Sequence, residues 1–187
     1  MKIYTIIGGV NGVGKSSLTG ALKRERTDLG KIIDVDKITA SFDGNRVKGG
    51  KKAISIINEC LNKNICFTQE TTLSEIRTEK TIIRAHDKGY YIRLYYVGLN
   101  SALESNKRIK NRVEKGGHNI DSKDVNKRFL SRFEDLTRIL PYCDEAIFFD
   151  NENGFVEVAE YRNGELLLKG SYHPDWIIEL KDLLIEC

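Results

Sequence analysis

An eight-residue motif near the start of the chain has the composition of a phosphate-binding loop. Residues 9–16 read Gly-Val-Asn-Gly-Val-Gly-Lys-Ser, which fits the Walker A pattern G-x-x-x-x-G-K-[ST]. Its glycines let backbone N–H groups turn toward phosphate oxygens, while Lys15 reaches the β- and γ-phosphates and the Ser16 hydroxyl can bind Mg²⁺. We therefore predict a nucleoside triphosphate site formed by Gly9, Val10, Asn11, Gly12, Val13, Gly14, Lys15, Ser16 and Ser17.

The flanking residues supply the context that this motif requires. An apolar run at residues 3–7 precedes it and predicts a strand, and residues 17–22 continue as a helix that we expect to run from Lys15 to about Arg26. A strand, a glycine-rich loop and a helix in this order place the phosphates at the positive end of the helix dipole. A chance glycine-rich turn would not bring all three together.

Three carboxylates follow two further predicted strands. Asp34 and Asp36 lie at the end of the strand predicted at residues 31–35, and Glu70 follows the strand predicted at 64–69. Ligands of open α/β sheets collect at the carboxyl ends of strands, so Asp36 is our candidate general base and Glu70 a candidate for orienting a hydroxyl-bearing acceptor or a metal-bound water. The structural alternatives are a helix cap for Asp36 and a first-turn glutamate that complements a helix dipole for Glu70.

A basic segment at residues 107–132 stands out in a nearly neutral chain, because it holds nine Lys or Arg residues against three acids. Its arginines are paired four residues apart on two predicted helices, Arg108 with Arg112 and Arg128 with Arg132, with Gly116-Gly117-His118 between the helices. Such a helical hairpin is suited to closing over a transferring phosphate as a lid. A solvated basic surface and a nucleic-acid contact are the other interpretations.

The rest of the chain predicts an α/β fold with a parallel sheet covered on both faces, because strand-like and helix-like segments alternate. Further strands are expected at 90–97 and 145–150, and a Thr72–Glu75 capping box is expected to start the helix that ends before Gly89. Residues 155–161 and 165–168 flank Asn163-Gly164, which predicts a type I′ hairpin, and a short helix follows at 174–184.

Length and composition narrow the class of protein. A chain of 187 residues with a net charge of +3 suits one domain and gives no general reason to expect nucleic-acid or membrane binding. The four cysteines are widely spaced, without a C-x-x-C pair, which is typical of reduced thiols. No run is long enough for a signal segment or a membrane span, so we expect a cytoplasmic protein.

Several motifs, taken in order, resemble the zeta-toxin-like P-loop kinases, in particular their short branch. They are the Walker A loop, Ile33-Asp34-Val35-Asp36, Glu70-Thr71-Thr72-Leu73-Ser74, Gly116-Gly117-His118 and Arg128-Phe129. The resemblance covers nearly the whole chain and implies a single P-loop kinase domain over residues 1–187. It further implies a five-stranded parallel sheet in the order 2-3-1-4-5, a lid at about 107–132, and a hairpin plus helix at about 154–187.

The resemblance also implies an activity and the residues that serve it. Zeta toxins phosphorylate a UDP-linked amino sugar with ATP or GTP and Mg²⁺, so a small-molecule hydroxyl is the expected acceptor and an antitoxin-like protein a candidate partner. Carried over by motif, Lys15, Asp36, Arg112 and Arg128 would be catalytic, and Ser16 would bind the metal. Glu70, Thr72, Arg108 and His118 would face the acceptor.

Two other classes stay open at this stage. Residues 146–150, Ala-Ile-Phe-Phe-Asp, have the form of a Walker B strand, which is compatible with a P-loop ATPase or a nucleotide switch that has no acceptor. No Asn-Lys-x-Asp motif for guanine follows. The basic segment is compatible with a polynucleotide 5′-hydroxyl kinase, although the tyrosines at 90, 91, 95 and 96 lie in a predicted core strand rather than on a stacking surface.

Overall fold

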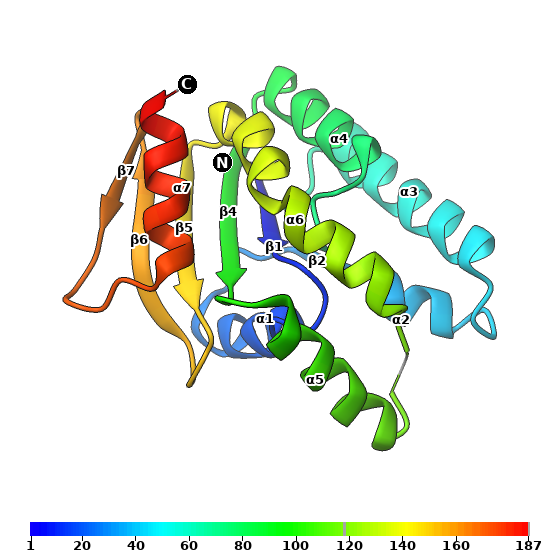
Figure 1. Cartoon of the computed structure of the whole chain (residues 1–187). Coiled ribbons are helices and arrows are strands. Elements are labelled where there is room, and N and C mark those ends of the chain that lie inside the picture. The colour runs from blue at the N-terminus through cyan, green and yellow to red at the C-terminus, as the bar shows by residue number, and fades with distance from the viewer. Residues whose placement is uncertain (118, 187) are drawn as a thin grey trace.

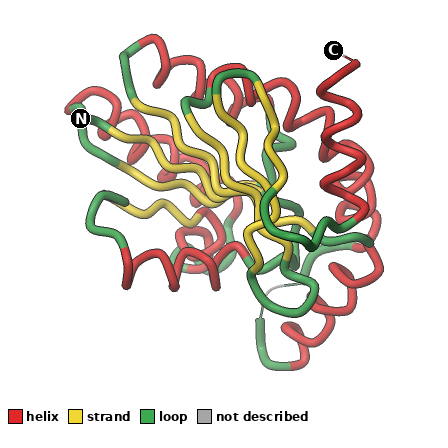
Figure 2. Tube along the Cα trace, turned by 90° about the vertical axis from the view of Figure 1, so that its left-hand side faces the viewer, coloured by secondary structure: helices red, strands yellow, loops and turns green. Residues whose placement is uncertain are grey.

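The carboxyl ends of three neighbouring strands meet at one edge of a central sheet in the computed structural model, which describes residues 1–117 and 119–186 (Figures 1 and 2). The sheet is mixed and seven-stranded, in the order β2-β3-β1-β4-β5-β6-β7. Its strands are β1 (Ile3–Gly8), β2 (Lys31–Asp34), β3 (Phe67–Thr71), β4 (Tyr91–Gly98), β5 (Glu145–Asp150), β6 (Val156–Arg162) and β7 (Glu165–Leu168).

The prediction of a five-stranded sheet is wrong in the number of strands. The strands β1 to β5 are parallel and have the predicted order, but β6 pairs antiparallel with β5 and β7 pairs antiparallel with β6. The C-terminal hairpin therefore extends the same sheet. Its turn residues Asn163 and Gly164 have φ of 56° and 85°, as a type I′ turn requires.

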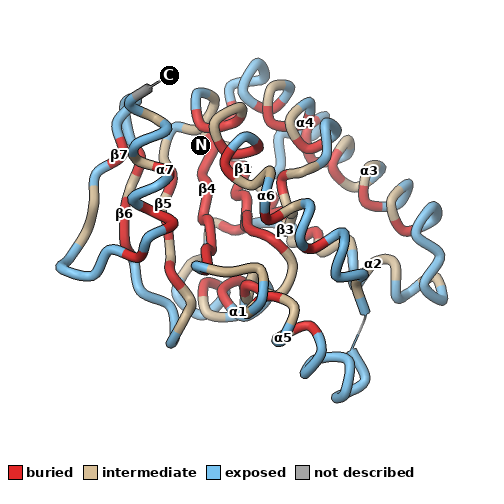
Figure 3. Tube along the Cα trace, viewed as in Figure 1, coloured by how far each residue is buried: buried red, intermediate tan, exposed pale blue. Residues whose placement is uncertain are grey.

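Helices cover both faces of the sheet, as predicted, but unevenly. Buried side chains of α3 (Arg46–Lys63), α4 (Ile76–Asp87), α6 (Ser122–Ile139) and α7 (Asp175–Glu186) form the larger apolar cluster on one face. The smaller cluster, on the other face, packs α1 (Lys15–Glu25) beneath the phosphate loop. Figure 3 shows the buried strands between these layers, whereas most of α5 (Ala102–Glu114) is exposed beyond its first turns.

Two local predictions fail between the strands. The strand predicted to reach Val35 ends at Asp34, because the Asp34 carboxylate accepts the Lys37 N–H at 3.1 Å and starts the short helix α2 (Val35–Ala40). The Thr72–Glu75 capping box does not form, since the Thr72 hydroxyl bonds Ser74 at 2.9 Å and Glu75 makes no side-chain cap. Asp36 therefore lies in the first turn of α2 and not at the end of a strand, where it was predicted.

The C-terminal helix is fixed by one tryptophan. Trp176 on α7 is 2% exposed, and its indole N–H donates to Asp150 Oδ1 at 2.8 Å. A Cβ at Gly98, at the end of β4, would lie 2.4 Å from the Trp176 ring, so the ring needs the space that glycine leaves. This contact joins α7 to the ends of β4 and β5.

Candidate functional site

The phosphate loop, Gly9–Ser16, connects β1 to α1 in the predicted way. The Lys15 ammonium donates to the carbonyl oxygens of Gly9 and Val10 at 2.7 and 2.9 Å, so it lies over the loop. Gly12 has φ of 82°, and a Cβ there would lie 2.6 Å from the Ser105 carbonyl oxygen of α5. Glycine at this position therefore permits both the turn and the close approach of α5.

The charge of Lys15 is influenced by its burial and by acids and arginines of the site. Burial lowers the pKa of Lys15 to about 8, while Glu70 and Asp36 act to raise this pKa and Arg128 and Arg112 act to lower it. A triphosphate would bring further negative charge to the same ammonium. The loop thus holds a cation whose charge depends on its ligand.

A cavity of about 170 Å³ opens between the phosphate loop and the carboxyl ends of β2 and β3. It is lined by Asn11, Lys15, Asp34, Val35, Asp36, Gln69, Glu70, Thr71, Thr72, Glu75, Thr78 and Arg128. The parallel register sets Asp34 of β2 opposite Glu70 of β3. Residues that are far apart in the sequence are therefore brought to one small polar space.

Glu70 lies against the Walker A serine. The Ser16 hydroxyl donates to Glu70 Oε2 at 2.7 Å, so a hydroxyl and a carboxylate converge beside the start of α1. These hard oxygen donors suit Mg²⁺, which usually takes one or two protein ligands together with phosphate oxygens. The described residues hold no group of three or more His, Cys, Asp or Glu side chains that could bind a metal by themselves.

The two candidate bases differ in their surroundings. Asp34 caps α2 and pairs with the Lys37 ammonium at 3.3 Å, whereas Asp36, in the first turn of α2, lines the cavity and is exposed. Among the described residues, no hydrogen bond or ion pair engages the Asp36 carboxylate. Asp36 is thus the acid at this end of β2 that is available to a ligand.

The arginines of the predicted lid differ in their contacts. Arg128 on α6 lines the cavity and donates to Asn11 Oδ1 of the phosphate loop at 2.6 Å. Arg132 instead packs against the rings of Phe129 and Phe133 and donates to Glu179 of α7 at 3.1 Å. Arg132 therefore joins α6 to α7, whereas Arg128 faces the phosphate loop.

Arg112 and Arg108 lie on α5, outside that cavity. Arg112 is exposed and contacts Gly117, whose Cβ would lie 2.6 Å from Arg112 Cγ. Arg108 bonds Glu104 at 2.9 Å and the Glu152 carbonyl at 3.1 Å. These contacts place Arg108 beside the β5–β6 loop, and its role toward the acceptor stays a prediction. His118, also predicted to face the acceptor, lies outside the described residues.

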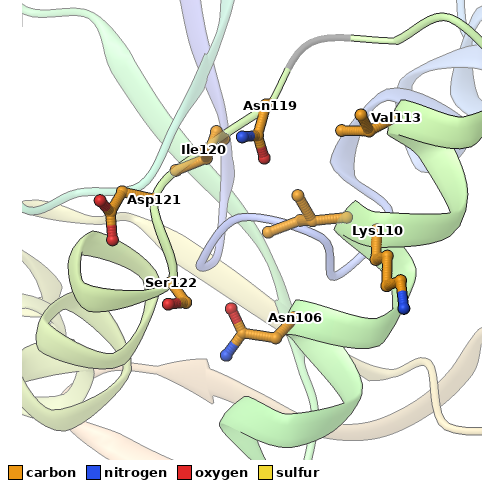
Figure 4. Close-up of a pocket in the computed structure, with 8 residues that line it drawn as sticks. Asn106, Lys110, Val113, Asn119, Ile120, Asp121 and Ser122 are labelled. Carbon is orange, nitrogen blue, oxygen red and sulfur yellow. The ribbon is translucent and has the colours of Figure 1, made fainter.

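A separate hollow lies between α5 and the start of α6 (Figure 4). Its volume is about 500 Å³, and it is lined by Asn106, Lys110 and Val113 of α5 and by the segment 119–122. Asn106 also donates to Asn126 of α6 at 3.0 Å. Within the described part of the chain, this hollow shares no lining residue with the cavity at Lys15.

Sequence reasoning missed several residues that shape the site. Gln69 lines the cavity and accepts the Tyr4 hydroxyl at 2.6 Å, and Thr78 contributes to the same wall. Asn151 donates to the Val13 carbonyl at 2.7 Å and so ties the β5–β6 loop to the phosphate loop. The period-two alternation of β3 predicts that Gln69 and Glu70 lie on opposite faces, but only the fold reveals that both reach the cavity.

Comparison with known proteins gives one sequence relative and several folds. The chain is 31% identical over 126 residues to an uncharacterized protein of Haemophilus influenzae, a match that covers 65% of this chain and 88% of that protein. The chain belongs to the family of that protein. No protein-family model matches the sequence.

Solved structures identify the fold. The structure superposes on a chain of the PezAT chromosomal toxin–antitoxin system of Streptococcus pneumoniae with a TM-score of 0.66 at 16% identity, covering all of this chain and 85% of that one. It superposes on AvrRxo1-ORF1:-ORF2 crystallised with ATP with a TM-score of 0.67 at 15% identity, covering 90% of this chain and 61% of the other. The fold is that of the zeta-toxin-like P-loop kinases.

The structure also places the tyrosines and cysteines of the sequence analysis. Tyr90, Tyr95 and Tyr96 are at most 3% exposed and are core residues, whereas Tyr91 is half-buried. Cys60, Cys66 and Cys143 are free thiols, as predicted, and Cys187 lies outside the described residues. None of the helices in the described part of the chain combines the length and the apolar character needed to cross a bilayer.

Proposed function

We propose that this protein is a phosphotransferase that moves the γ-phosphate of ATP or GTP to a hydroxyl group of a small molecule. The observation that carries the proposal is the unengaged carboxylate of Asp36, which lines one cavity with Lys15 and Glu70. A hydrolase or a switch needs the phosphate loop, but it does not need room for an acceptor flanked by acids beside that loop. The fold and the ATP complex of AvrRxo1-ORF1:-ORF2 support a nucleotide donor.

The proposed reaction is a displacement at the γ-phosphorus. Asp36 accepts the proton of the acceptor hydroxyl as its oxygen bonds to the γ-phosphorus, and the bond from phosphorus to the β–γ bridging oxygen breaks to release ADP or GDP. Lys15 and Arg128 neutralise charge on the phosphate oxygens, and Glu70 orients the acceptor or a water. When bound at Ser16, Mg²⁺ supplies further positive charge to the phosphates.

The contacts of Asp150 argue against the alternative of a Walker B hydrolase. This carboxylate is 1% exposed and accepts the Trp176 indole N–H and the Glu152 backbone N–H at 2.8 and 2.9 Å. It is therefore committed to the contact with α7, on the face of the sheet that does not hold α1.

A transfer assay tests the proposal. The protein is incubated with ATP or GTP, Mg²⁺ and mixtures of UDP-sugars, nucleosides, aminoglycoside-like alcohols and 5′-hydroxyl oligonucleotides, and mass spectrometry detects a gain of one phosphate. We expect a small-molecule product that depends on Lys15, with Lys15→Ala as the control. Hydrolysis of ATP without any phosphorylated acceptor would contradict the proposal, and phosphorylation of oligonucleotides alone would assign the polynucleotide class instead.

A UDP-linked amino sugar as acceptor and an antitoxin-like protein as partner are part of the proposal. The superposition on the PezAT toxin–antitoxin system supports the antitoxin-like partner as a starting point, and the amino-sugar acceptor rests on the motif resemblance. If the activity is toxic, expression of the wild-type chain in a bacterial host will arrest growth, and expression of the Lys15→Ala variant will not. Equal growth of the two strains would remove the reason to look for an antitoxin.

A further inference from the structure

A second cavity adjoins the one at the phosphate loop. It lies between α3 and α4, has a volume of about 270 Å³, and shares Val35, Gln69, Glu75 and Thr78 with the cavity that holds Lys15. The two spaces are therefore neighbours on either side of a common wall. We call the second space the α3–α4 groove and define it by its residues: Val35, Gly50, Ala53, Ile54, Ile57, Asn58, Gln69, Glu75, Arg77, Thr78, Lys80, Thr81 and Arg84.

The floor of the α3–α4 groove is apolar. Ala53 and Ile57 are 3% and 6% exposed, and the half-buried Val35 and Ile54 complete this surface. The groove is open beside Gly50, because a Cβ built there would meet no atom of another element within 4 Å. An apolar surface of this kind gains from contact with an apolar body that displaces water.

The rim of the groove is basic along α4. Arg77, Lys80 and Arg84 follow one another at spacings of three and four residues, so they lie on one face of the helix. Arg77 and Arg84 are seven residues apart in sequence, which corresponds to about 10 Å along the helix axis. All three are exposed, and no carboxylate of the described residues pairs with them. Arg84 only donates to Asn58 at 3.1 Å.

The wall between the two cavities offers hydrogen-bond donors. Gln69 is buried, and its Oε1 accepts the Tyr4 hydroxyl at 2.6 Å, which leaves the Nε2 amide group to donate to a ligand. Asp36 and Glu70 lie beyond this wall. Glu75, an exposed carboxylate, lines both cavities beside this wall. The order of chemistry is thus acids at the phosphate-loop cavity and at the wall, an amide donor, an apolar floor and a row of cations.

From this order we infer that the α3–α4 groove binds the body of the acceptor, and that the acceptor is an alcohol with an apolar body and an anionic group remote from the reacting hydroxyl. The inference rests on the proposed function, because it uses Asp36 as the site of reaction. The anionic group pairs with the cations on α4, while the apolar body covers Ile54 and Ile57. The hydroxyl then reaches Asp36 and Glu70.

Direct binding of a probe with this chemistry tests the inference without requiring transfer. The probe is 6-(hydroxymethyl)-2-naphthoate, and its neutral analogue is 2-naphthalenemethanol; both are titrated calorimetrically in the presence of a non-hydrolysable ATP analogue and Mg²⁺. We expect the naphthoate to bind at least about tenfold more tightly than the neutral alcohol, in keeping with a charged contact at a partly exposed site. Equal affinities, or no binding of the naphthoate, would overturn the inference.

Two variants and two matched controls locate the site. Lys80→Glu combined with Arg84→Glu reverses two rim charges and should weaken naphthoate binding at least about tenfold, whereas Lys51→Glu combined with Lys52→Glu, on exposed positions of α3 outside the groove, should not. Gly50→Leu fills the groove and should abolish binding, whereas Ser55→Leu on the exposed side of α3 should not.

The outcomes for the groove and for the proposed function are separable. Probe binding that follows this pattern in a protein that transfers no phosphate would support the groove and refute the phosphotransferase. Transfer to an acceptor with a KM unchanged by Gly50→Leu would support the phosphotransferase and refute the groove. Thermal melting of each variant establishes that it is folded before its affinity is compared.

Discussion

Exchange of Asp36 or Asp34 for asparagine is the sharpest test of the proposed base. Asp36 carries no hydrogen bond or ion pair among the described residues, so Asp36→Asn should leave the fold unchanged and remove only the proton acceptor. A positioned base contributes about 10²-fold or more, which corresponds to about 2.7 kcal/mol of transition-state free energy. We expect kcat to fall by that factor while the Kd for ATP stays within about twofold.

The Asp34→Asn variant is the matched control. Asparagine caps a helix about as well as aspartate, so the bond to the Lys37 N–H is kept and only an ion pair with a largely exposed lysine is lost, at less than about 1 kcal/mol. The melting temperature should fall by no more than about 4 °C and kcat should stay within about threefold. Phosphate transfer from labelled ATP, calorimetric ATP binding and thermal melting measure the three quantities. If Asp34→Asn loses transfer and Asp36→Asn retains it, the reasoning from the unengaged carboxylate is refuted.

Three further predictions concern charge and packing. The pKa of Lys15 is lowered to about 8 in the free protein and a triphosphate favours the charged form, so ATP affinity should fall by up to about tenfold per pH unit above pH 8. Calorimetry at about pH 7 and 9.5 measures this change, and equal Kd values would contradict it. Arg128→Ala should lower kcat by about 10²–10³-fold with little change in the Kd for ATP, whereas Arg132→Ala should lower the melting temperature and leave kcat unchanged. The reverse pattern in transfer and melting assays would show that the wrong arginine has been placed at the phosphate. Gly98→Ala puts a methyl group 2.4 Å from the Trp176 ring and should reduce the free energy of unfolding by about 1–3 kcal/mol. A denaturant titration measures this change, and an unchanged midpoint would mean that α7 moves to accommodate the methyl group at no cost.

The sequence was sufficient for the parts of this molecule that depend on local pattern. The Walker A loop and the Asn163-Gly164 turn follow from motifs of a few neighbouring residues, whereas the order of the five parallel strands came from the resemblance to the zeta-toxin-like kinases. The short helix α2 was not predicted, because Asp34 is both the last residue of strand β2 and the N-cap of α2. Only the folded structure shows that the chain turns from strand to helix at this residue.

The site residues divide in the same way. Asp36 and Glu70 could be proposed from strand ends, since parallel strands bring their carboxyl ends together. Arg128 and Arg132 have equal spacing and charge, and the sequence cannot separate them; their roles diverge because Arg132 lies between two phenylalanine rings and Arg128 reaches Asn11. Gln69 could be recognised as a site residue only in the folded structure, where it lines both the cavity at Lys15 and the α3–α4 groove.

The continuation of the sheet through the hairpin has a consequence for the behaviour of the protein in concentrated solution. Both outer strands, β2 on one side and β7 on the other, are only four residues long. A short border leaves few unpaired backbone N–H and C=O groups for a strand of a neighbouring molecule to join, and charged side chains, Lys31 and Glu165, begin each of the two strands. The longer and more apolar strands, β1 and β4, lie inside the sheet, where their hydrogen bonds are already made. The arrangement protects the chain against edge-to-edge aggregation.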